Sequence, residues 1–169
     1  GASGITVAIG YDLGYASPSK IRNDFGDKVD ADTLEALVKY SGYKGEAAHA
    51  KLRAARSEID IPWDIAMRVF MECDVPEWTE KVTSILPNCD KLSEDSLGAL
   101  VSLAYNRGPS FKLSGSRYTE MRNIYNHMEN EEFDEIADEI RAMKRLWPNV
   151  SGLKRRRDEE ADLFEEGLE

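Results

Sequence analysis

A threonine, a tyrosine and an aspartate near the N-terminus are the first residues whose types could do chemistry. Thr6 lies in a short β-type run, and Tyr11 and Asp12 follow it within a glycine-bounded segment. A hydroxyl and a carboxylate could act on a substrate, and a tyrosine ring could stack on a sugar. Each residue also has a structural interpretation, because threonine favours strands, aspartate favours turns and a tyrosine can pack in a core.

A second polar group closes an apolar segment in the middle of the chain. Tyr105, Asn106 and Arg107 follow leucines, valine and alanines at helical spacing. Asparagine and arginine are good hydrogen-bonding partners for sugar hydroxyls and carboxylates. Asn106 could equally cap the end of the helix, and this alternative stays open.

The cysteines and histidines do not form a metal-binding pattern. Cys73 and Cys89 belong to no Cys-x-x-Cys or Cys/His motif, so the sequence predicts no zinc site and no cofactor. A disulfide between them would suit an oxidising compartment, and each also fits a buried thiol. The sequence slightly favours two reduced, buried thiols over a disulfide.

These groups must be positioned by a mostly helical chain. A length of 169 residues suits one domain, which we expect to cover residues 1–169. Residues 4–10 favour a strand, and the glycines at 10 and 14 favour a turn and a short return segment. From there the apolar spacing predicts helices, with starts at Ser17, Asp30, Pro62, Pro76, Ser93 and Ser151. The predicted class is α+β, mostly α-helical, with a small N-terminal β-hairpin followed by about eight helices.

Charge and hydropathy each exclude one class of partner. The chain has 22 Lys and Arg against 32 Asp and Glu, for a net charge of −10, whereas a general nucleic-acid binder needs a basic surplus. No apolar run of about 18 residues could span a membrane. The basic run Lys154–Arg157 is followed by acids at helical spacing, so we expect ion pairs on a solvated helix.

Three segments together resemble one family. They are Gly4–Gly14, Leu97–Gly108, and Leu146–Trp147 with Gly152–Ala161. In order and spacing they are similar to the phage-type lysozymes, and especially to the pesticin-like muramidase branch. The resemblance implies a lysozyme-like fold. It also implies hydrolysis of the β-1,4 bond between N-acetylmuramic acid and N-acetylglucosamine in bacterial peptidoglycan.

The resemblance also implies roles for residues. Thr6 would orient the attacking water, and Asp12 would activate that water or stabilise positive charge on the sugar. Tyr11, Tyr105, Asn106 and Arg107 would contact the substrate. The general-acid glutamate of the family precedes the hairpin, so we expect this chain to be a fragment whose catalytic helix lies upstream. The spacing of the chain's own glutamates, among them Glu35, Glu46, Glu58 and Glu72, singles out no replacement.

Several alternatives remain open at this point. A chitosanase or a lytic transglycosylase would share the broad architecture, and a degenerate scaffold could bind peptidoglycan or another protein without catalysis. The acidic charge suits a lytic or effector domain carried by a larger protein, secreted or delivered to the periplasm or cell wall. It also suits a basic partner such as an immunity protein. Retaining and inverting chemistry differ in carboxyl separation, which sequence does not give.

Overall fold

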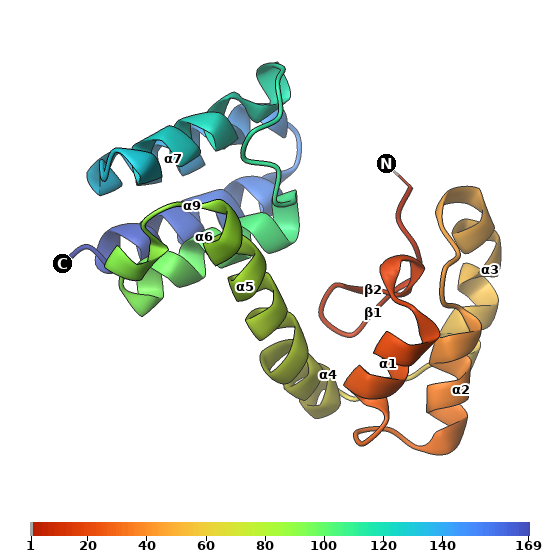
Figure 1. Ribbon diagram of the computed structural model, residues 1–169. Coiled ribbons are helices and arrows are strands. Elements are labelled where there is room, and N and C mark those ends of the chain that lie inside the picture. Colours follow the sequence, from red (N-terminus) through yellow and green to blue (C-terminus); the bar gives the residue numbers. More distant parts are fainter. Residues whose placement is uncertain (1) are drawn as a thin grey trace. The chain divides into compact units, whose positions relative to one another are not determined.

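The computed structural model describes residues 2–169, and this part of the chain is mostly helical (Figure 1). It is 70% helix and 4% strand, with a two-stranded hairpin at the N-terminus followed by helices. The predicted α+β, mostly α-helical class is therefore confirmed. No helix within residues 2–169 is long and apolar enough to cross a membrane. The chain forms two compact units, one ending at Pro76 and the other running from Glu77 to Glu169.

The first unit opens with the hairpin. Strand β1 (Thr6–Val7) pairs antiparallel with β2 (Tyr11–Asp12), so that Thr6 lies opposite Asp12. The predicted strand over residues 4–10 was too long. Ala8 and Gly10 have φ angles of 53° and 72°, and this left-handed backbone turns the chain directly after β1.

Short helices complete the first unit. They are the 3-10 turn Leu13–Tyr15, α1 (Pro18–Phe25), α2 (Ala31–Lys39), α3 (Gly45–Glu58) and α4 (Trp63–Val69). Two predicted starts are confirmed by their caps. The Ser17 hydroxyl accepts the Lys20 N–H at 3.1 Å, and the Asp30 carboxylate accepts the Thr33 N–H at 2.7 Å. Each side chain satisfies a backbone donor that has no partner within the helix.

The core of the first unit holds the hairpin in place. Ile5, Tyr11 and Leu13 are buried in one cluster with side chains from the helices. These partners include Ile21, Phe25, Leu37, Tyr40, Ala48, Ala55 and Val69. Burying a side chain of this size stabilises the fold by about 1.5–3 kcal/mol. The backbone around Thr6 and Asp12 is thus anchored from both strands.

A π-helical turn, Phe70–Asp74, lies between α4 and α5 (Val75–Ile85). Its closing hydrogen bond runs from the Val75 N–H to the Phe70 carbonyl. Pro76 explains the widening, because a proline ring clashes with the carbonyl four residues earlier in a regular α-helix. The predicted helix start at Pro76 is right to within one residue, but sequence did not predict the π turn before it.

The second unit is built on two long helices. Helix α6 (Glu94–Arg107) packs against α9 (Ser151–Glu166) (Figure 1). Helix α9 also packs against α8 (Ile136–Ala142). The remaining elements are 3-10 turns at Cys89–Lys91, Ser116–Tyr118, Phe133–Glu135 and Met143–Leu146, and helix α7 (Thr119–Glu129). Their core joins side chains such as Leu100, Leu103, Met121, Ile124, Met128, Ile140 and Phe164.

The helix starts of the second unit gave mixed outcomes. Ser93 caps α6 as predicted, with its hydroxyl accepting the Ser96 N–H at 3.2 Å. Ser151 does not cap α9. It is the first residue of that helix, and Val150 precedes it without a side-chain cap. The Val150 side chain has no oxygen that could cap the helix, although its backbone carbonyl accepts the Lys154 N–H at 3.2 Å. The sequence rule for serine therefore placed the start one residue too late.

Both cysteines are free thiols. Cys89 is buried at the start of a 3-10 turn, and burial raises its pKa to about 11. Cys73 is partly buried in the π-helical turn, and burial raises its pKa as well. Neither thiol is therefore activated as a nucleophile near neutral pH.

Candidate functional site

The hairpin brings Thr6 and Asp12 together. They are directly opposite partners across β1 and β2, and Thr6 is exposed while Asp12 is half-buried. The Leu13 N–H donates to the Ile5 carbonyl at 2.9 Å, which makes Thr6 and Asp12 a pair without mutual backbone hydrogen bonds. Side chains of such pairs approach each other most closely. The hydroxyl and the carboxylate therefore share one face of the hairpin.

Backbone groups fix the Asp12 carboxylate. Its Oδ1 accepts the Gly4 N–H at 3.0 Å and the Gly14 N–H at 2.8 Å, and its Oδ2 lies 3.1 Å from the same Gly4 nitrogen. Asp12 thus ties the entry to β1 to the turn after β2. This arrangement makes Asp12 a brace for the hairpin, and its oxygens face backbone amides.

The glycines on either side of the hairpin are required by this brace. A Cβ atom on Gly4 would lie 2.4 Å from the Gly14 Cα, and one on Gly14 would lie 2.7 Å from the Gly4 Cα. Backbone atoms cannot yield as a flexible side chain can. Gly4 and Gly14 are therefore the residues that let the start of β1 and the turn after β2 approach each other and donate to Asp12.

Tyr11 packs in the core of the first unit, which was the structural alternative to stacking on a sugar. It is 4% exposed, and its ring meets Phe25 edge to face at 4.9 Å. Its hydroxyl donates to Asp24 Oδ2 at 2.7 Å. Burial and the neighbouring Asp24 raise the pKa of Tyr11 well above its usual range. Tyr11 therefore supports the strand that carries Asp12, and its ring is not presented to a ligand.

Asp24 is the buried acid beneath the hairpin. Burial alone would raise its pKa, but hydrogen bonds from Lys20 and Tyr11 lower it below its usual value. Lys20 Nζ lies 2.6 Å from Asp24 Oδ2. Because a general acid must stay protonated, Asp24 does not fit that role.

Two of the first unit's glutamates are also poor general acids. The Arg22 guanidinium lowers the pKa of Glu35, and hydrogen bonds from Lys39 and Tyr40 lower that of Glu58. Both shifts run opposite to the raised pKa that proton donation to a glycosidic oxygen needs. Glu72 lies 3.4 Å from Lys28 Nζ. Their environments therefore agree with the sequence, which singled out no replacement acid among them.

The predicted residues of the second unit sit at the end of α6. Tyr105 meets Trp78 edge to face at 5.6 Å. Asn106 is exposed, and its Oδ1 accepts from Arg157 Nη2 at 2.9 Å. The Arg107 guanidinium lies over the ring of Tyr118, with its carbon 4.9 Å from the ring centre. These three residues belong to the second unit, whereas Thr6 and Asp12 belong to the first.

Sequence reasoning missed the residue that organises this corner. Arg157 is fully buried, where a solvated helix face was expected, and that part of the prediction is wrong. Its Nε donates to Glu160 at 2.6 Å, so the expected ion pair forms, but inside the protein. Glu160 also accepts from Arg156 at 3.3 Å and from Ser102 at 2.5 Å. The three-residue spacing between Arg157 and Glu160 predicted their ion pair. No feature of the neighbouring sequence predicted that this pair is buried.

Two arginine nitrogens in this corner have no acceptor within residues 2–169. They are Arg107 Nε and Arg157 Nη1, and both atoms are buried. Both guanidinium groups lie near Trp147, at 5.9 Å and 5.4 Å from its ring. Burial lowers the pKa of Arg107. These two N–H groups are therefore unpaired donors inside the corner, and neither is presented to solvent.

No protein-family model matches the chain, and no curated protein matches it. Within residues 2–169, no group of His, Cys, Asp and Glu side chains could together hold a metal ion. Inference about function therefore depends on the hairpin and on the end of α6.

Proposed function

We propose that this chain is part of a peptidoglycan muramidase of the phage-type lysozyme superfamily, similar to its pesticin-like branch. The observation that carries the proposal is the position of the exposed Thr6 directly opposite Asp12 on the hairpin. Gly4 and Gly14 approach each other closely there and hold the Asp12 carboxylate through their backbone N–H groups. These are the residues through which the Gly4–Gly14 segment resembles that family. The chemistry would be hydrolysis of the β-1,4 bond between N-acetylmuramic acid and N-acetylglucosamine.

In this mechanism Thr6 positions the attacking water. Its hydroxyl both donates and accepts hydrogen bonds, and it is exposed on a strand that the core holds in place. Asp12 fixes that strand through the Gly4 and Gly14 amides, and its carboxylate would activate the water or stabilise positive charge on the oxocarbenium-like sugar. The resemblance implies a proton-donating glutamate upstream of this segment, and the lowered pKa values of Glu35 and Glu58 do not suit either to that role.

The end of α6 would bind the substrate. Asn106 and Arg107 would donate to sugar hydroxyls or to carboxylates of the peptide stems, with Tyr105 beside them. The buried Arg157 fixes the Asn106 amide through its 2.9 Å hydrogen bond. Arg157 is therefore a positioning residue in this proposal.

The setting of the activity follows from its substrate. The enzyme would be secreted, or delivered to the periplasm or cell wall, as the lytic or effector domain of a larger protein. The net charge of −10 would repel an anionic polymer, which favours delivery by a carrier over free diffusion. The same charge would suit a basic immunity protein as partner.

The test is mass spectrometry of the fragments released from purified sacculi. The protein that carries this chain with its upstream segment should release muropeptides with reducing muramic-acid ends. Its Thr6→Val variant should not, and the Thr6→Ser variant should keep part of the activity. Anhydro-muramic ends would instead indicate a lytic transglycosylase.

A non-catalytic wall-binding module is the second candidate, and the Asp12 geometry favours it. Both Asp12 oxygens lie against backbone amides, as expected for a brace that no longer acts in catalysis. This candidate predicts sedimentation with sacculi and no released fragments. It would replace the muramidase proposal if the protein with its original Thr6 sedimented with sacculi and released no fragments.

A further inference from the structure

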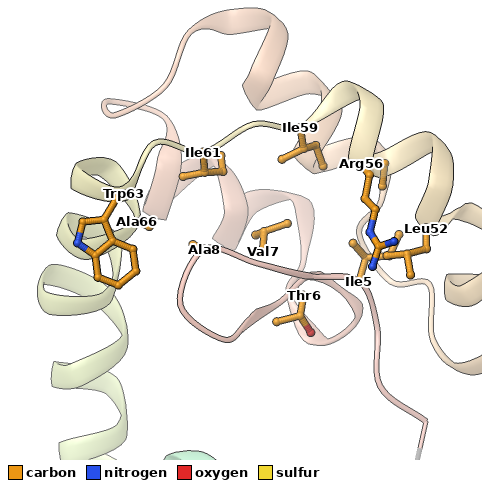
Figure 2. A pocket seen from close by; sticks show the side chains of 11 residues that line it. Ile5, Thr6, Val7, Ala8, Leu52, Arg56, Ile59, Ile61, Trp63 and Ala66 are labelled. Carbon is orange, nitrogen blue, oxygen red and sulfur yellow. The ribbon is translucent and has the colours of Figure 1, made fainter.

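A pocket of about 290 Å³ lies beside β1 within the first unit (Figure 2). One wall is formed by four successive residues, 5 to 8. The opposite wall comes from α3 and the segment leading into α4, and consists of Leu52, Ala55, Arg56, Ile59, Ile61, Trp63 and Ala66. Its volume is near the lower end of the range for small-ligand sites. We call it the β1 edge pocket.

The pocket faces the edge of the strand. Successive strand side chains point to opposite faces, so a pocket lined by four in a row meets the edge between the faces. β2 is the only strand paired with β1 within residues 2–169. Because Thr6 and Asp12 are a non-hydrogen-bonded pair, the Thr6 N–H and C=O point away from β2. A ligand in the pocket would therefore meet one donor and one acceptor that β2 does not use.

Arg56 supplies a charge at one end of the pocket. It makes no hydrogen bond or ion pair with any residue of the described chain, whereas Lys20, Arg22, Lys28 and Lys39 of the same unit are all paired with acids. Figure 2 shows its guanidinium turned toward Ile5 and Leu52 at the pocket wall. An unpaired guanidinium there is suited to a carboxylate.

Trp63 supplies an aromatic surface at the other end. It is 70% exposed at the start of α4, and Figure 2 shows its indole at the Ala8 end of the pocket. Val7, Ile59 and Ile61 lie between the two ends and give an apolar floor. This floor offers no side-chain hydrogen bonds to a row of sugar hydroxyls, but it suits the alkyl side chains of a peptide.

We propose that the β1 edge pocket binds a short extended peptide that carries a carboxylate. One ligand residue would pair with the Thr6 N–H and C=O, as a peptide does when it adds to a sheet edge. Arg56 would take the carboxylate, and Trp63 would cover an apolar side chain. If the proposed muramidase function holds, on which the identity of the ligand rests, this peptide is the stem peptide of peptidoglycan. Thr6 would then link the peptide site to the site of cleavage.

The test is a nuclear magnetic resonance titration of the 169-residue chain with a synthetic stem tetrapeptide, L-alanyl-γ-D-glutamyl-L-lysyl-D-alanine. The Trp63 indole N–H and the Thr6 amide should shift. Arg56→Gln should weaken binding by about fivefold, the upper range for an exposed ion pair. Trp63→Ala should weaken it by about tenfold, the scale of one aromatic anchor. Circular dichroism of each variant reports whether it is folded.

Matched controls are present in the same unit. Arg53→Gln removes an exposed arginine that makes no hydrogen bond or ion pair within residues 2–169 and lies on α3 outside the pocket wall. Met71→Ala removes an exposed apolar side chain outside the pocket. Both should leave the affinity unchanged. The tetrapeptide with its glutamyl carboxylate amidated should bind the original chain as weakly as the acid binds Arg56→Gln.

Three results would overturn the inference. They are equal losses in Arg53→Gln and Arg56→Gln, shifts that avoid Thr6 and Trp63, and a peptide-free chito-oligosaccharide that binds the pocket as well as the tetrapeptide. An unrelated acidic peptide that binds equally well would overturn the assignment to stem peptide. None of these readouts needs hydrolysis. Peptide binding by the chain, with no release of muropeptides by the protein that carries it and its upstream segment, would contradict the muramidase proposal and leave the peptide site standing.

Discussion

The two units each hold a carboxylate in place, and they do so with different donors. In the hairpin, Asp12 accepts hydrogen bonds from the backbone N–H groups of Gly4 and Gly14. In the second unit, Glu160 accepts from the side chains of Arg156, Arg157 and Ser102. Asp12 is half-buried, whereas Glu160 is 3% exposed.

The difference shows what each arrangement demands of the sequence. Backbone donors are present at every residue except proline, so Asp12 needs only small neighbours that let the backbone approach. Side-chain donors must be supplied by particular residues, and the pair of Glu160 with Arg157 brings two charges into the interior. The hairpin is therefore sensitive to added volume, and the second unit is sensitive to unbalanced charge.

Unbalancing the charge should have the largest effect. Glu160→Leu leaves the fully buried Arg157 without an anion, and this should lower the free energy of unfolding by about 3–5 kcal/mol. Guanidinium denaturation followed by circular dichroism measures the loss. The double variant with Arg157→Met removes the stranded charge and should recover most of it. A double variant no more stable than the single one would show that the charge is not the cause.

Adding volume in the hairpin should have the next largest effect. Gly14→Ala places a Cβ 2.7 Å from the Gly4 Cα and from the Tyr43 carbonyl oxygen, which should cost about 1–3 kcal/mol. Gly98→Ala is the control, because no atom lies within 4 Å of its Cβ position on α6. A helix-interior alanine there should stabilise by about 0.4–1 kcal/mol. If both substitutions changed the free energy of unfolding in the same direction, the proposed role of close glycine packing in the hairpin would be contradicted.

A third carboxylate extends the comparison to pH. The pKa of Asp24 is lowered in the folded protein by Lys20 and Tyr11 despite burial, so its contribution to stability is present at neutral pH. That contribution is lost as pH falls below about 4 and through the lowered pKa. Tyr11→Phe removes one of the hydrogen bonds and should cost about 1 kcal/mol at pH 7. The cost should shrink in denaturation curves at pH 3, and a pH-independent cost would contradict this assignment.

The smallest effect should come from an exposed pair. Lys91 and Glu131 are about half exposed and lie 2.6 Å apart. Solvent and side-chain entropy cancel most of the gain from such a pair. Lys91→Met should therefore leave the denaturation midpoint unchanged within error, and it provides the baseline for the other variants. A clear shift in the denaturation midpoint would mean that exposed ion pairs also stabilise the second unit, in addition to its buried charges.

The parts that sequence predicted are those decided by neighbours in the chain. The caps at Ser17, Asp30 and Ser93 depend on a hydroxyl or carboxylate within three residues of a free N–H. The hairpin followed from a β-type run between glycines. The motif also named Thr6 and Asp12, which the structure places as cross-strand partners.

The parts that sequence did not predict depend on contacts distant in the chain. Arg157 is buried because α9 packs against α6, and nothing within one turn of α9 reveals this. The sequence left open whether Tyr11 packs in the core or contacts a substrate. Its hydrogen bond to Asp24 and its ring contact with Phe25 show that it packs in the core. Arg56 and Trp63 carry no recognisable motif, and only the fold brings both to the β1 edge pocket.

The most direct test of the central claim compares Thr6 with Thr6→Val in the protein that carries this chain and its upstream segment. The measured quantity is the rate at which reducing muramic-acid ends appear when purified sacculi are digested. A water-positioning hydroxyl predicts a loss of about 100-fold in Thr6→Val with an unchanged denaturation midpoint. Equal rates for the two proteins would contradict the account, since the exposed hydroxyl opposite Asp12 would then have no part in the reaction.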